Sequence, residues 1–255
     1  MSFSAFFRKH SMFNCILFFC ATLWCDEWVI VANGFPISSA ELQESLVGRT
    51  VLALDGAANQ FQSFKHCPDY ILGDFDSVSD PAYWGITTTF SDLDESHLPY
   101  CGNFGTTIVP AKDQDHTDLE KGILYCDQAN ASSVLIVQAT GGRMDHTLGN
   151  LEVLKKYHRA DRDLTIWTEK EQIFYLCDGK IEVEGGIGEH CAIMGYPRAL
   201  MTTSGLAYNG HDYLVELGVQ ESTCNTIADS LATISIQGEA LIILPRSCKK
   251  LRISN

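Results

Sequence analysis

The amino-acid sequence predicts an α/β protein in two parts: an N-terminal parallel-sheet domain, then a smaller all-β sandwich domain. Three observations carry this prediction. In the first part, short apolar β-branched runs alternate with helical segments, which is the pattern of a parallel sheet covered by helices. Four of the five runs lead into a polar turn that contains glycine. After about residue 160, short strand candidates follow one another through Gly-rich turns without helices between them.

The elements of the first part, residues 27–162, follow from continuous apolar runs and from helix caps. Strands buried on both faces of a parallel sheet carry such runs. The predicted strands are 28–32, 50–54, 69–72, 106–109 and 133–138. The predicted helices are 40–47, a segment from the acidic run 113–120 to about 126, and a segment from 141–146 to about 157. The segment 78–105, rich in Asp, Ser, Thr and Pro, is expected to be a loop.

The second part, residues 163–255, contains only strand candidates. They are 164–168, 173–176, 180–183, 190–194, 213–217, 232–236 and 241–244. No internal repeat and no low-complexity linker separates the two parts. We therefore expect the parallel domain and the β domain to pack closely.

Composition and charge narrow the class of protein. The chain has 255 residues, 45% of them hydrophobic and 20% charged, which excludes a disordered, collagen-like or coiled-coil protein. It carries 18 basic and 32 acidic residues, a formal charge of −14, which argues against a general nucleic-acid binder. A polyphosphate ligand would need metal ions, or a run of backbone N–H groups, to overcome that charge.

The ten cysteines contain no C-x-x-C pair. Structural zinc sites need closely spaced pairs, and disulfide scaffolds have a higher cysteine density. We expect most of these cysteines to be reduced and partly buried.

Residues 1–26 are expected to form a hydrophobic N-terminal extension. Arg8 and Lys9 precede the apolar run 12–24, as in a signal peptide, but no small-residue cleavage site follows. The run is too short for a stable membrane-spanning helix. We therefore expect a cytoplasmic protein without a stable membrane anchor, and export is the lesser alternative.

Two carboxylates, Asp74 and Asp76, flank Phe75 after the third predicted strand. Alternation along an extended chain puts both carboxylates on one side and Phe75 in the core. Paired carboxylates repel each other unless a cation lies between them, and Mg²⁺ suits such oxygen ligands. The alternative is a polar turn in which an aspartate caps a loop.

A second acidic cluster contains Asp113, Asp115 and Asp118. Asp115 and Asp118 are three residues apart at a predicted helix start, so they are expected to share a face of that helix. The alternative is helix capping with a favourable helix dipole.

The turn Gly141-Gly142-Arg143 supplies the opposite charge. Two glycines allow a phosphate to approach the backbone, and a guanidinium binds phosphate oxygens in a bidentate manner. The alternative is a Gly-rich turn in which Arg143 pairs with a surface acid. His146, three residues on, is expected to be a hydrogen-bonded structural histidine.

Four motifs in this order resemble the thiamine pyrophosphokinase family. They are Asp55-Gly-Ala, Gly73-Asp-Phe-Asp-Ser, Asp113-Gln-Asp-His-Thr-Asp-Leu-Glu and Gly141-Gly-Arg-Met-Asp-His-x-Leu-Gly-Asn. The resemblance is strong over residues 28–155 and weaker at 205–208 and 221–226. It implies an enzyme that transfers pyrophosphate from ATP to thiamine with Mg²⁺, giving thiamine diphosphate and AMP. It also implies a homodimer paired through the β domain.

The resemblance assigns roles residue by residue. It implies Mg²⁺ ligands at Asp74, Asp76 and Asp118, which with Asp145 are the catalytic residues. It implies ATP and phosphate contacts at Asp55, Gln114, Thr117 and Arg143, and thiamine contacts at Tyr208, Ser222, Thr223 and Asn225. Either Asp145 or Asp76 would accept the proton of the attacking alcohol. Two departures concern the thiamine site: Tyr208 stands where the family commonly has Trp, and Cys224 where it commonly has Ser.

Two other functions stay open at this point. A related hydroxymethyl-pterin pyrophosphokinase would keep the acidic motifs, but it would need no β domain that stacks on thiamine, so residues 205–226 count against it. A non-catalytic nucleotide-binding module with a β dimerisation domain would bind ATP without releasing AMP.

Overall fold

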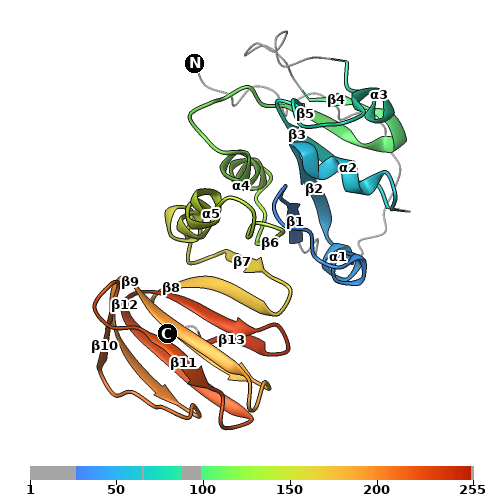
Figure 1. Cartoon of the computed structure of the whole chain (residues 1–255). Helices are drawn as coiled ribbons and strands as arrows, with labels where there is room; N and C mark the ends of the chain where they lie inside the picture. The colour runs from blue at the N-terminus through green and yellow to red at the C-terminus, as the bar shows by residue number, and fades with distance from the viewer. Residues whose placement is uncertain (1–26, 65, 88–98, 254–255) are drawn as a thin grey trace, which may run out of the picture.

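The computed structural model describes residues 27–64, 66–87 and 99–253, which form a 13-stranded mixed sheet (Figure 1). The predicted N-terminal extension lies outside these residues. The strands of the parallel section are β1 (Glu27–Val31), β2 (Thr50–Leu54), β3 (Tyr70–Gly73), β5 (Thr107–Pro110), β6 (Ser133–Val137) and β7 (Asp163–Trp167). Five of them match the predicted strands of the first part within one residue at either end. The short β4 (Tyr100–Cys101) pairs antiparallel with β5 at the sheet edge.

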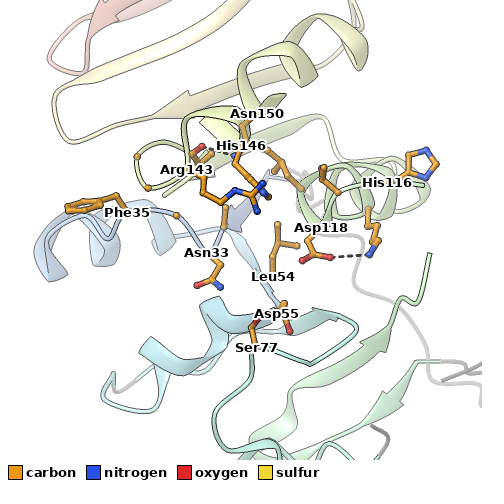
Figure 2. Close-up of a pocket in the computed structure, with 18 of the residues that line it drawn as sticks. Asn33, Phe35, Leu54, Asp55, Ser77, His116, Asp118, Arg143, His146 and Asn150 are labelled. Atoms are coloured by element: carbon orange, nitrogen blue, oxygen red, sulfur yellow. Dashed lines mark hydrogen bonds and ion pairs between the residues drawn. The ribbon is translucent and has the colours of Figure 1, made fainter. Parts of the chain in front are cut away.

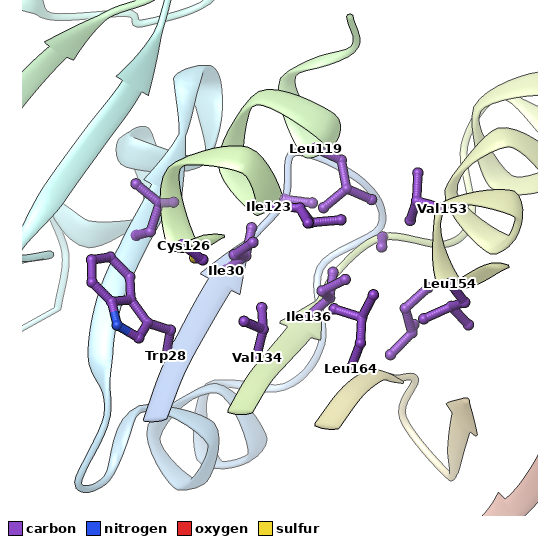
Figure 3. Packing of buried hydrophobic residues seen from close by; sticks show 14 of the residues in the cluster. Trp28, Ile30, Leu119, Ile123, Cys126, Val134, Ile136, Val153, Leu154 and Leu164 are labelled. Carbon is purple, nitrogen blue, oxygen red and sulfur yellow. The ribbon is translucent and has the colours of Figure 1, made fainter. Parts of the chain in front are cut away.

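Helices cover both faces of the parallel section (Figure 1). α4 (Asp118–Gln128) and α5 (Met144–Lys156) lie on one face. α1 (Ser39–Leu46), α2 (Ala58–Phe61) and α3 (Pro81–Trp84) lie on the other. Strand residues alternate between the two cores: Ile30 packs against Ile123 of α4 (Figure 3), whereas Val29 packs with Leu42 of α1. Both strand faces are therefore apolar, which explains the continuous hydrophobic runs.

The strand order places a switch point beside β1. From β1 the chain adds β2, β3 and β5 on one side, and then returns to add β6 and β7 on the other. The connections on the two sides therefore leave β1 in opposite directions. In open parallel sheets, ligands bind in the crevice at the carboxyl ends of the strands next to such a point.

The predicted division at residues 162 and 163 is corrected by β7. That strand was assigned to the β domain, but it pairs in parallel with β6, with Leu164 beside Val134. It was misassigned because no helix follows it. Instead, a tight turn leads directly into β8 (Glu171–Glu184), which pairs antiparallel with β7.

The second part is built on three long strands rather than on many short ones. β8, β9 (His190–Ser204) and β12 (Leu231–Pro245) pair antiparallel along most of their length, and β10 (Tyr213–Glu216), β11 (Ser222–Thr226) and β13 (Lys249–Ile253) pair with β9 or β8. The predicted strands 173–176 and 180–183 are one strand, as are 232–236 and 241–244. The β8–β12 register shifts between Ile236 and Glu239, and Gly238 has φ 98°. This bulge interrupts the apolar pattern within a single strand.

The two parts share one sheet and pack closely, as predicted. Arg246, in the turn after β12, donates to Glu41 (3.1 Å) and Glu44 (2.8 Å) of α1. Its guanidinium lies 4.4 Å from the centre of the Trp167 ring. On the other face, Lys155 of α5 pairs with Glu239 of β12 (2.7 Å).

Two observations bear on the cysteines and on membrane association. The seven cysteines among the described residues are free thiols, and three of them, Cys126, Cys191 and Cys248, are buried. None of the helices in the described ranges is both long and apolar enough to cross a membrane.

Candidate active site

A cavity of about 720 Å³ opens at the carboxyl ends of β1, β2, β3, β5 and β6 (Figure 2). We call it the strand-end cavity. It lies where the switch point predicts a ligand, and its volume suits a small organic ligand. Of the site residues predicted from the sequence, it is lined by Asp55, Asp74, Asp76, Gln114, Thr117, Asp118 and Arg143. His146, which was expected to have a structural role, also lines it.

Three carboxylates meet on one wall of this cavity. Asp55, Asp74 and Asp76 each offer an oxygen, and the three oxygens lie within 4.8 Å of one another. Asp55 is only 4% exposed, and its Oδ1 has no hydrogen-bond partner among the described residues. Burial raises the pKa of the Asp55 carboxyl, although a hydrogen bond from Ser77 opposes the shift. An unpartnered buried oxygen beside two further carboxylates is a donor set that suits a hard divalent cation.

The Asp74 and Asp76 pair is built differently from the extended chain that the sequence predicted. Phe75 is buried, as predicted, but it has φ 66°, in the left-handed region that side chains avoid. The Asp76 backbone N–H donates to Asp74 Oδ1 (3.3 Å), and Ser77 Oγ donates to Asp76 Oδ1 (2.8 Å). A tight turn therefore brings the two carboxylates together.

The second acidic cluster is largely separate from the cavity. Helix α4 begins at Asp118, so Asp115 lies outside it and the predicted shared helix face is wrong. Asp113 accepts hydrogen bonds from the Asp115 N–H (2.8 Å) and the His116 ring (2.5 Å), and these contacts lower the pKa of Asp113. Neither Asp113 nor Asp115 lines the cavity. Asp118 does line it, but it lies outside the trio and pairs with Lys121 Nζ (3.1 Å).

Thr117 and Gln114 line the cavity while making local contacts. Thr117 caps α4: its Oγ1 accepts from the Glu120 N–H (3.3 Å), and Glu120 accepts from the Thr117 N–H (2.9 Å). This capping box fixes where the helix begins. Gln114 Nε2 donates to the Lys112 carbonyl (3.1 Å). Both side chains therefore also stabilise the turn that leads into α4.

The Gly141-Gly142 turn forms the wall opposite the carboxylate trio. Both glycines have positive φ, 83° and 68°. At Gly141 a Cβ atom would lie 2.5 Å from the Cβ of Phe35, so no larger residue fits there. Thr147 Oγ1 accepts from the Gly141 N–H (3.1 Å), and Asn150 donates to the Ala139 carbonyl (2.7 Å). The first turns of α5 thus hold this loop in place.

Arg143 and Asp145 form an exposed bidentate pair. Arg143 Nε lies 3.1 Å from Asp145 Oδ1, and Arg143 Nη2 lies 2.5 Å from Asp145 Oδ2. This contact lowers the pKa of Asp145 to about 2. Arg143 lines the cavity and Asp145 does not. Figure 2 shows Arg143 across the cavity from Asp55 and Ser77.

The turn after β1 contributes residues that sequence reasoning did not select. Asn33 and Phe35 both line the cavity. A Cβ atom at Gly56 would lie 2.5 Å from Asn33 Nδ2, so the turns after β1 and β2 are in close contact. The signal available in the sequence was the position of Asn33 and Phe35 just after a buried strand.

The predicted thiamine residues lie together in the β part and do not line the strand-end cavity. Asn225 is buried; its Oδ1 accepts from the Tyr208 N–H (3.1 Å) and its Nδ2 donates to the Tyr208 carbonyl (2.7 Å). Asn225 Nδ2 also lies 3.4 Å from Ser222 Oγ. Thr223 is exposed on the same strand, and the Tyr208 side chain is 73% exposed. Asn225 therefore fixes the backbone that presents an open aromatic ring.

The fold is that of a doubly wound α/β protein with an open cavity at the switch point of its sheet. Residues 47–167 match the family model described as the thiamin pyrophosphokinase catalytic domain, and relatives with about 30% identity bear the same name. This region of the chain therefore resembles the catalytic domain of thiamine pyrophosphokinases.

The relatives with this name include plant proteins. Thiamine pyrophosphokinase 1 of Arabidopsis thaliana is 30% identical over 190 residues, which cover 69% of this chain and 65% of that protein. Thiamine pyrophosphokinase 1 of Oryza sativa subsp. japonica is 30% identical over 190 residues, with 69% and 66% covered. The chain thus spans about 65% of the length of these relatives.

Solved structures share the fold. The thiamine pyrophosphokinase of Bacillus subtilis superposes with a TM-score of 0.68 at 20% identity, covering 86% of this chain and 98% of that one. The enzyme of Candida albicans superposes with a TM-score of 0.67 at 16% identity, covering 88% and 90%. The mixed α/β architecture is therefore common to the family.

Proposed function

We propose that this protein is a thiamine diphosphokinase that transfers a pyrophosphoryl group from ATP to the hydroxyl of thiamine, releasing AMP. One observation carries the proposal: a single cavity unites the trio of Asp55, Asp74 and Asp76 with the Gly141–Arg143 turn. The trio suits a cation and the turn suits phosphate oxygens, and both lie in the region that matches the thiamin pyrophosphokinase catalytic domain. A cytoplasmic location stays a prediction from the sequence.

Mg²⁺ is the cation that we propose for the trio. Asp74 and Asp76 are the ligands expected from the sequence, and the buried Asp55 supplies the third oxygen in place of Asp118. When bound, Mg²⁺ neutralises charge on the phosphate oxygens. Asp118 instead orients Lys121, whose side chain is 8% exposed and lines the cavity, toward the phosphates.

The reaction requires positioning and charge neutralisation. The thiamine hydroxyl oxygen bonds to the β-phosphorus of ATP, the bond from that phosphorus to the α,β-bridging oxygen breaks, and the oxygen leaves with AMP. Arg143 and the N–H group of Gly142 bind phosphate oxygens as charge moves to the leaving group. Because the turn is held by Thr147, these donors are placed before the substrates bind.

The proton of the attacking hydroxyl goes to a carboxylate. Of the two candidates from the sequence, Asp145 has a pKa lowered to about 2 by Arg143, which makes it a weak proton acceptor at neutral pH. Asp76 lines the cavity and lies in the trio. We therefore assign the proton to Asp76, through the carboxylate oxygen that does not bind the cation.

Thiamine recognition would involve a second copy of the chain. Tyr208 presents an exposed ring, and aromatic rings stack on cationic heterocycles such as thiazolium. Tyr208, Ser222, Thr223 and Asn225 lie outside the strand-end cavity of their own chain. We propose a homodimer in which the β part of one chain completes the cavity of the other.

A product assay tests the activity. Purified protein is incubated with ATP, Mg²⁺ and thiamine, and AMP and thiamine diphosphate are quantified by chromatography. We expect equal amounts of both products, and neither without thiamine. ATP binding without AMP release would support the non-catalytic module instead. Activity with a hydroxymethyl-pterin but not with thiamine would support the related pyrophosphokinase.

A further inference from the structure

The carboxylate trio is assembled from two separate segments of the chain. Asp55 belongs to the turn after β2, whereas Asp74 and Asp76 belong to the turn after β3. The two segments are in direct contact, because a Cβ atom at Gly73 would lie 2.9 Å from the Cβ of Asp55. The spacing of the three carboxylates therefore depends on how firmly the second turn is held against the first.

Both turns contain a residue in an unfavourable backbone conformation. Asp55 has φ 43° and Phe75 has φ 66°, which lie in the left-handed region that side chains avoid. Such conformations persist where the surrounding structure holds them in place. For the turn after β3, the neighbouring helix α2 supplies contacts of this kind.

Asn59 of α2 makes three hydrogen bonds to the turn after β3. Its Nδ2 donates to the Ser77 carbonyl (2.9 Å), and its Oδ1 accepts from the N–H (2.8 Å) and the Oγ (2.9 Å) of Ser79. A short helical turn, Asp55–Ala57, continues directly into α2, so one segment carries both Asp55 and Asn59. Asn59 does not line the strand-end cavity, and it therefore acts on the carboxylates only through the turn that it binds.

We propose that Asn59 is a positioning residue that sets the spacing of the carboxylate trio and thereby makes the trio selective for Mg²⁺ over the larger Ca²⁺. The inference rests on the proposed function, because it takes the trio as the cation site. It adds a residue outside the cavity that decides which divalent cation fits.

Ser77 connects Asn59 to the carboxylates. Its carbonyl accepts from Asn59, and its Oγ donates to Asp76 Oδ1 (2.8 Å). Ser77 is also hydrogen-bonded to the Asp55 carboxyl, on the other segment. A displacement of Ser77 would therefore move Asp76 relative to Asp55.

The two cations differ in what they require of their ligands. Mg²⁺ needs near-ideal octahedral geometry with oxygens at about 2.0–2.1 Å, whereas Ca²⁺ accepts a flexible arrangement of oxygens at about 2.3–2.6 Å. Carboxylates held at a fixed, close spacing suit the smaller ion, and loosely held carboxylates can still surround the larger one. Loss of the Asn59 contacts should therefore weaken Mg²⁺ binding more than Ca²⁺ binding.

Calorimetric titration of the full chain with MgCl₂ and with CaCl₂ tests the inference. We expect Asn59→Ala to lower the Mg²⁺ affinity about tenfold, the lower end of the usual effect of losing an outer contact of a metal site, and to change the Ca²⁺ affinity much less. Asn59→Asp keeps the acceptor for Ser79 but cannot donate to the Ser77 carbonyl. Its added charge acts alike on both divalent ions, so its ratio of Mg²⁺ to Ca²⁺ affinity should also fall.

Asn103→Ala is the matched control. Asn103 Nδ2 donates to the carbonyls of Ala82 (3.2 Å) and Tyr83 (2.8 Å), in a turn that does not line the cavity. This variant should lower the melting temperature without changing the affinity for either cation. Because binding to the folded state raises the melting temperature, the rise caused by Mg²⁺ should be smaller in Asn59→Ala but not in Asn103→Ala.

Other results would overturn the inference. If Asn59→Ala lowered both affinities equally, or lowered only the melting temperature, Asn59 would stabilise the turn without setting the spacing. AMP formation by the wild type would then still support the proposed function. A change of the affinity ratio in Asn103→Ala as large as in Asn59→Ala would reveal a general effect of lost stability. If the wild-type protein bound neither cation, the cation site of the proposed function would itself be wrong.

Discussion

Asp55 is a single residue whose placement in the cavity lowers the stability of the folded protein. It is buried with an unpartnered oxygen and lies next to two other carboxylates. Burial of an unpaired carboxylate destabilises the folded protein unless a cation or a proton neutralises it. The raised pKa of Asp55 expresses this cost, which is expected where a site is built to bind a cation.

The first prediction concerns catalysis by the carboxylate trio. Asp74→Asn and Asp76→Asn should each lower the rate of AMP formation by about 100-fold or more, because charge neutralisation at the phosphates is lost. Asp115→Asn, which removes an exposed carboxylate outside the cavity, should keep wild-type activity. Thermal melting should be similar for all three variants. Near wild-type AMP formation by Asp76→Asn at saturating Mg²⁺ would show that the cation site is assigned wrongly.

The second prediction concerns pH and Asp55 in protein freed of divalent cations. Because the folded state raises the pKa of Asp55, its contribution to the free energy of unfolding is fully present below the unfolded pKa of about 4 and is lost as pH rises through the folded pKa. Urea unfolding between pH 4 and 8 should show this loss, and Asp55→Asn should lack it. Mg²⁺ should restore stability to the wild type at high pH but not to Asp55→Asn. Identical pH profiles for the two proteins would contradict the assignment.

The third prediction concerns the reciprocal amide pair of Gln60 and Gln138. Gln138 is 3% exposed, so Gln138→Leu leaves the Gln60 amide without its partner. We expect a loss of about 1–3 kcal/mol in the free energy of unfolding by urea denaturation. The double variant with Gln60→Leu should lose less than the sum of the two single variants, because both polar groups are then removed together. Strict additivity would show that the pair contributes nothing as a unit.

At the scale of elements, the sequence predicted the parallel section well and the β part poorly. The buried runs at 50–54 and 133–137 have no polar interruption, so their bounds followed from composition. In β8 and β12 the alternation breaks at bulges near Asp178 and Gly238, and a sequence pattern cannot distinguish a bulge from the end of a strand. β7 was assigned to the wrong section because pairing partners are tertiary information.

The site residues likewise fall into two groups: those whose proximity follows from local sequence, and those that only the folded sheet brings together. Asp74 and Asp76 are separated by one residue in the sequence, so their proximity could be predicted. Asp55 joins them only because β2 and β3 are neighbours in the sheet, which no local spacing reports. Asp118 was expected as a cation ligand, but the start of α4 turns it toward Lys121.

The fourth prediction concerns the contacts that Arg246, in the turn after β12, makes with helix α1. We call these contacts the Arg246 clasp. The side chain of Arg246 is 12% exposed, and it contacts Glu41, Glu44 and the Trp167 ring. Arg246→Ala should lower the free energy of unfolding by about 1–2 kcal/mol, because it removes the packing of the guanidinium on the Trp167 ring together with its ion pairs to α1. Lys249→Ala, an exposed neighbour, should change it by less than about 0.5 kcal/mol. A cost as small as that of Lys249→Ala would show that the clasp does not hold the parts together.

At the scale of the whole molecule, the two groups of predicted site residues lie in different parts of one chain. The acidic trio follows β2 and β3 of the parallel section, whereas Tyr208 lies between β9 and β10 of the β part. Shared sites in the proposed homodimer would bring the two groups together without any change within either chain.

The fifth prediction tests that arrangement by mixing two inactive variants. One chain carries Asp76→Asn and the other Tyr208→Ala. If sites are shared, each heterodimer has one site with neither substitution, so the mixture should regain up to about a quarter of wild-type activity after random exchange. Subunit exchange is verified with differently tagged chains. Exchange without recovery of AMP formation would show that each site is built within one chain.

The unbroken sheet has a mechanical consequence. Backbone hydrogen bonds connect neighbouring strands from β4 at one edge to β10 at the other. A bending motion that brought Tyr208 over the acidic trio would have to break the backbone hydrogen bonds between β7 and β8. Hinge motions in proteins instead occur at loops or at the ends of elements. Arg246 and Lys155 brace that seam from opposite faces. The protein is therefore expected to bind its ligands without closing its two parts on each other, and any gating must come from short turns or from the association of two rigid subunits.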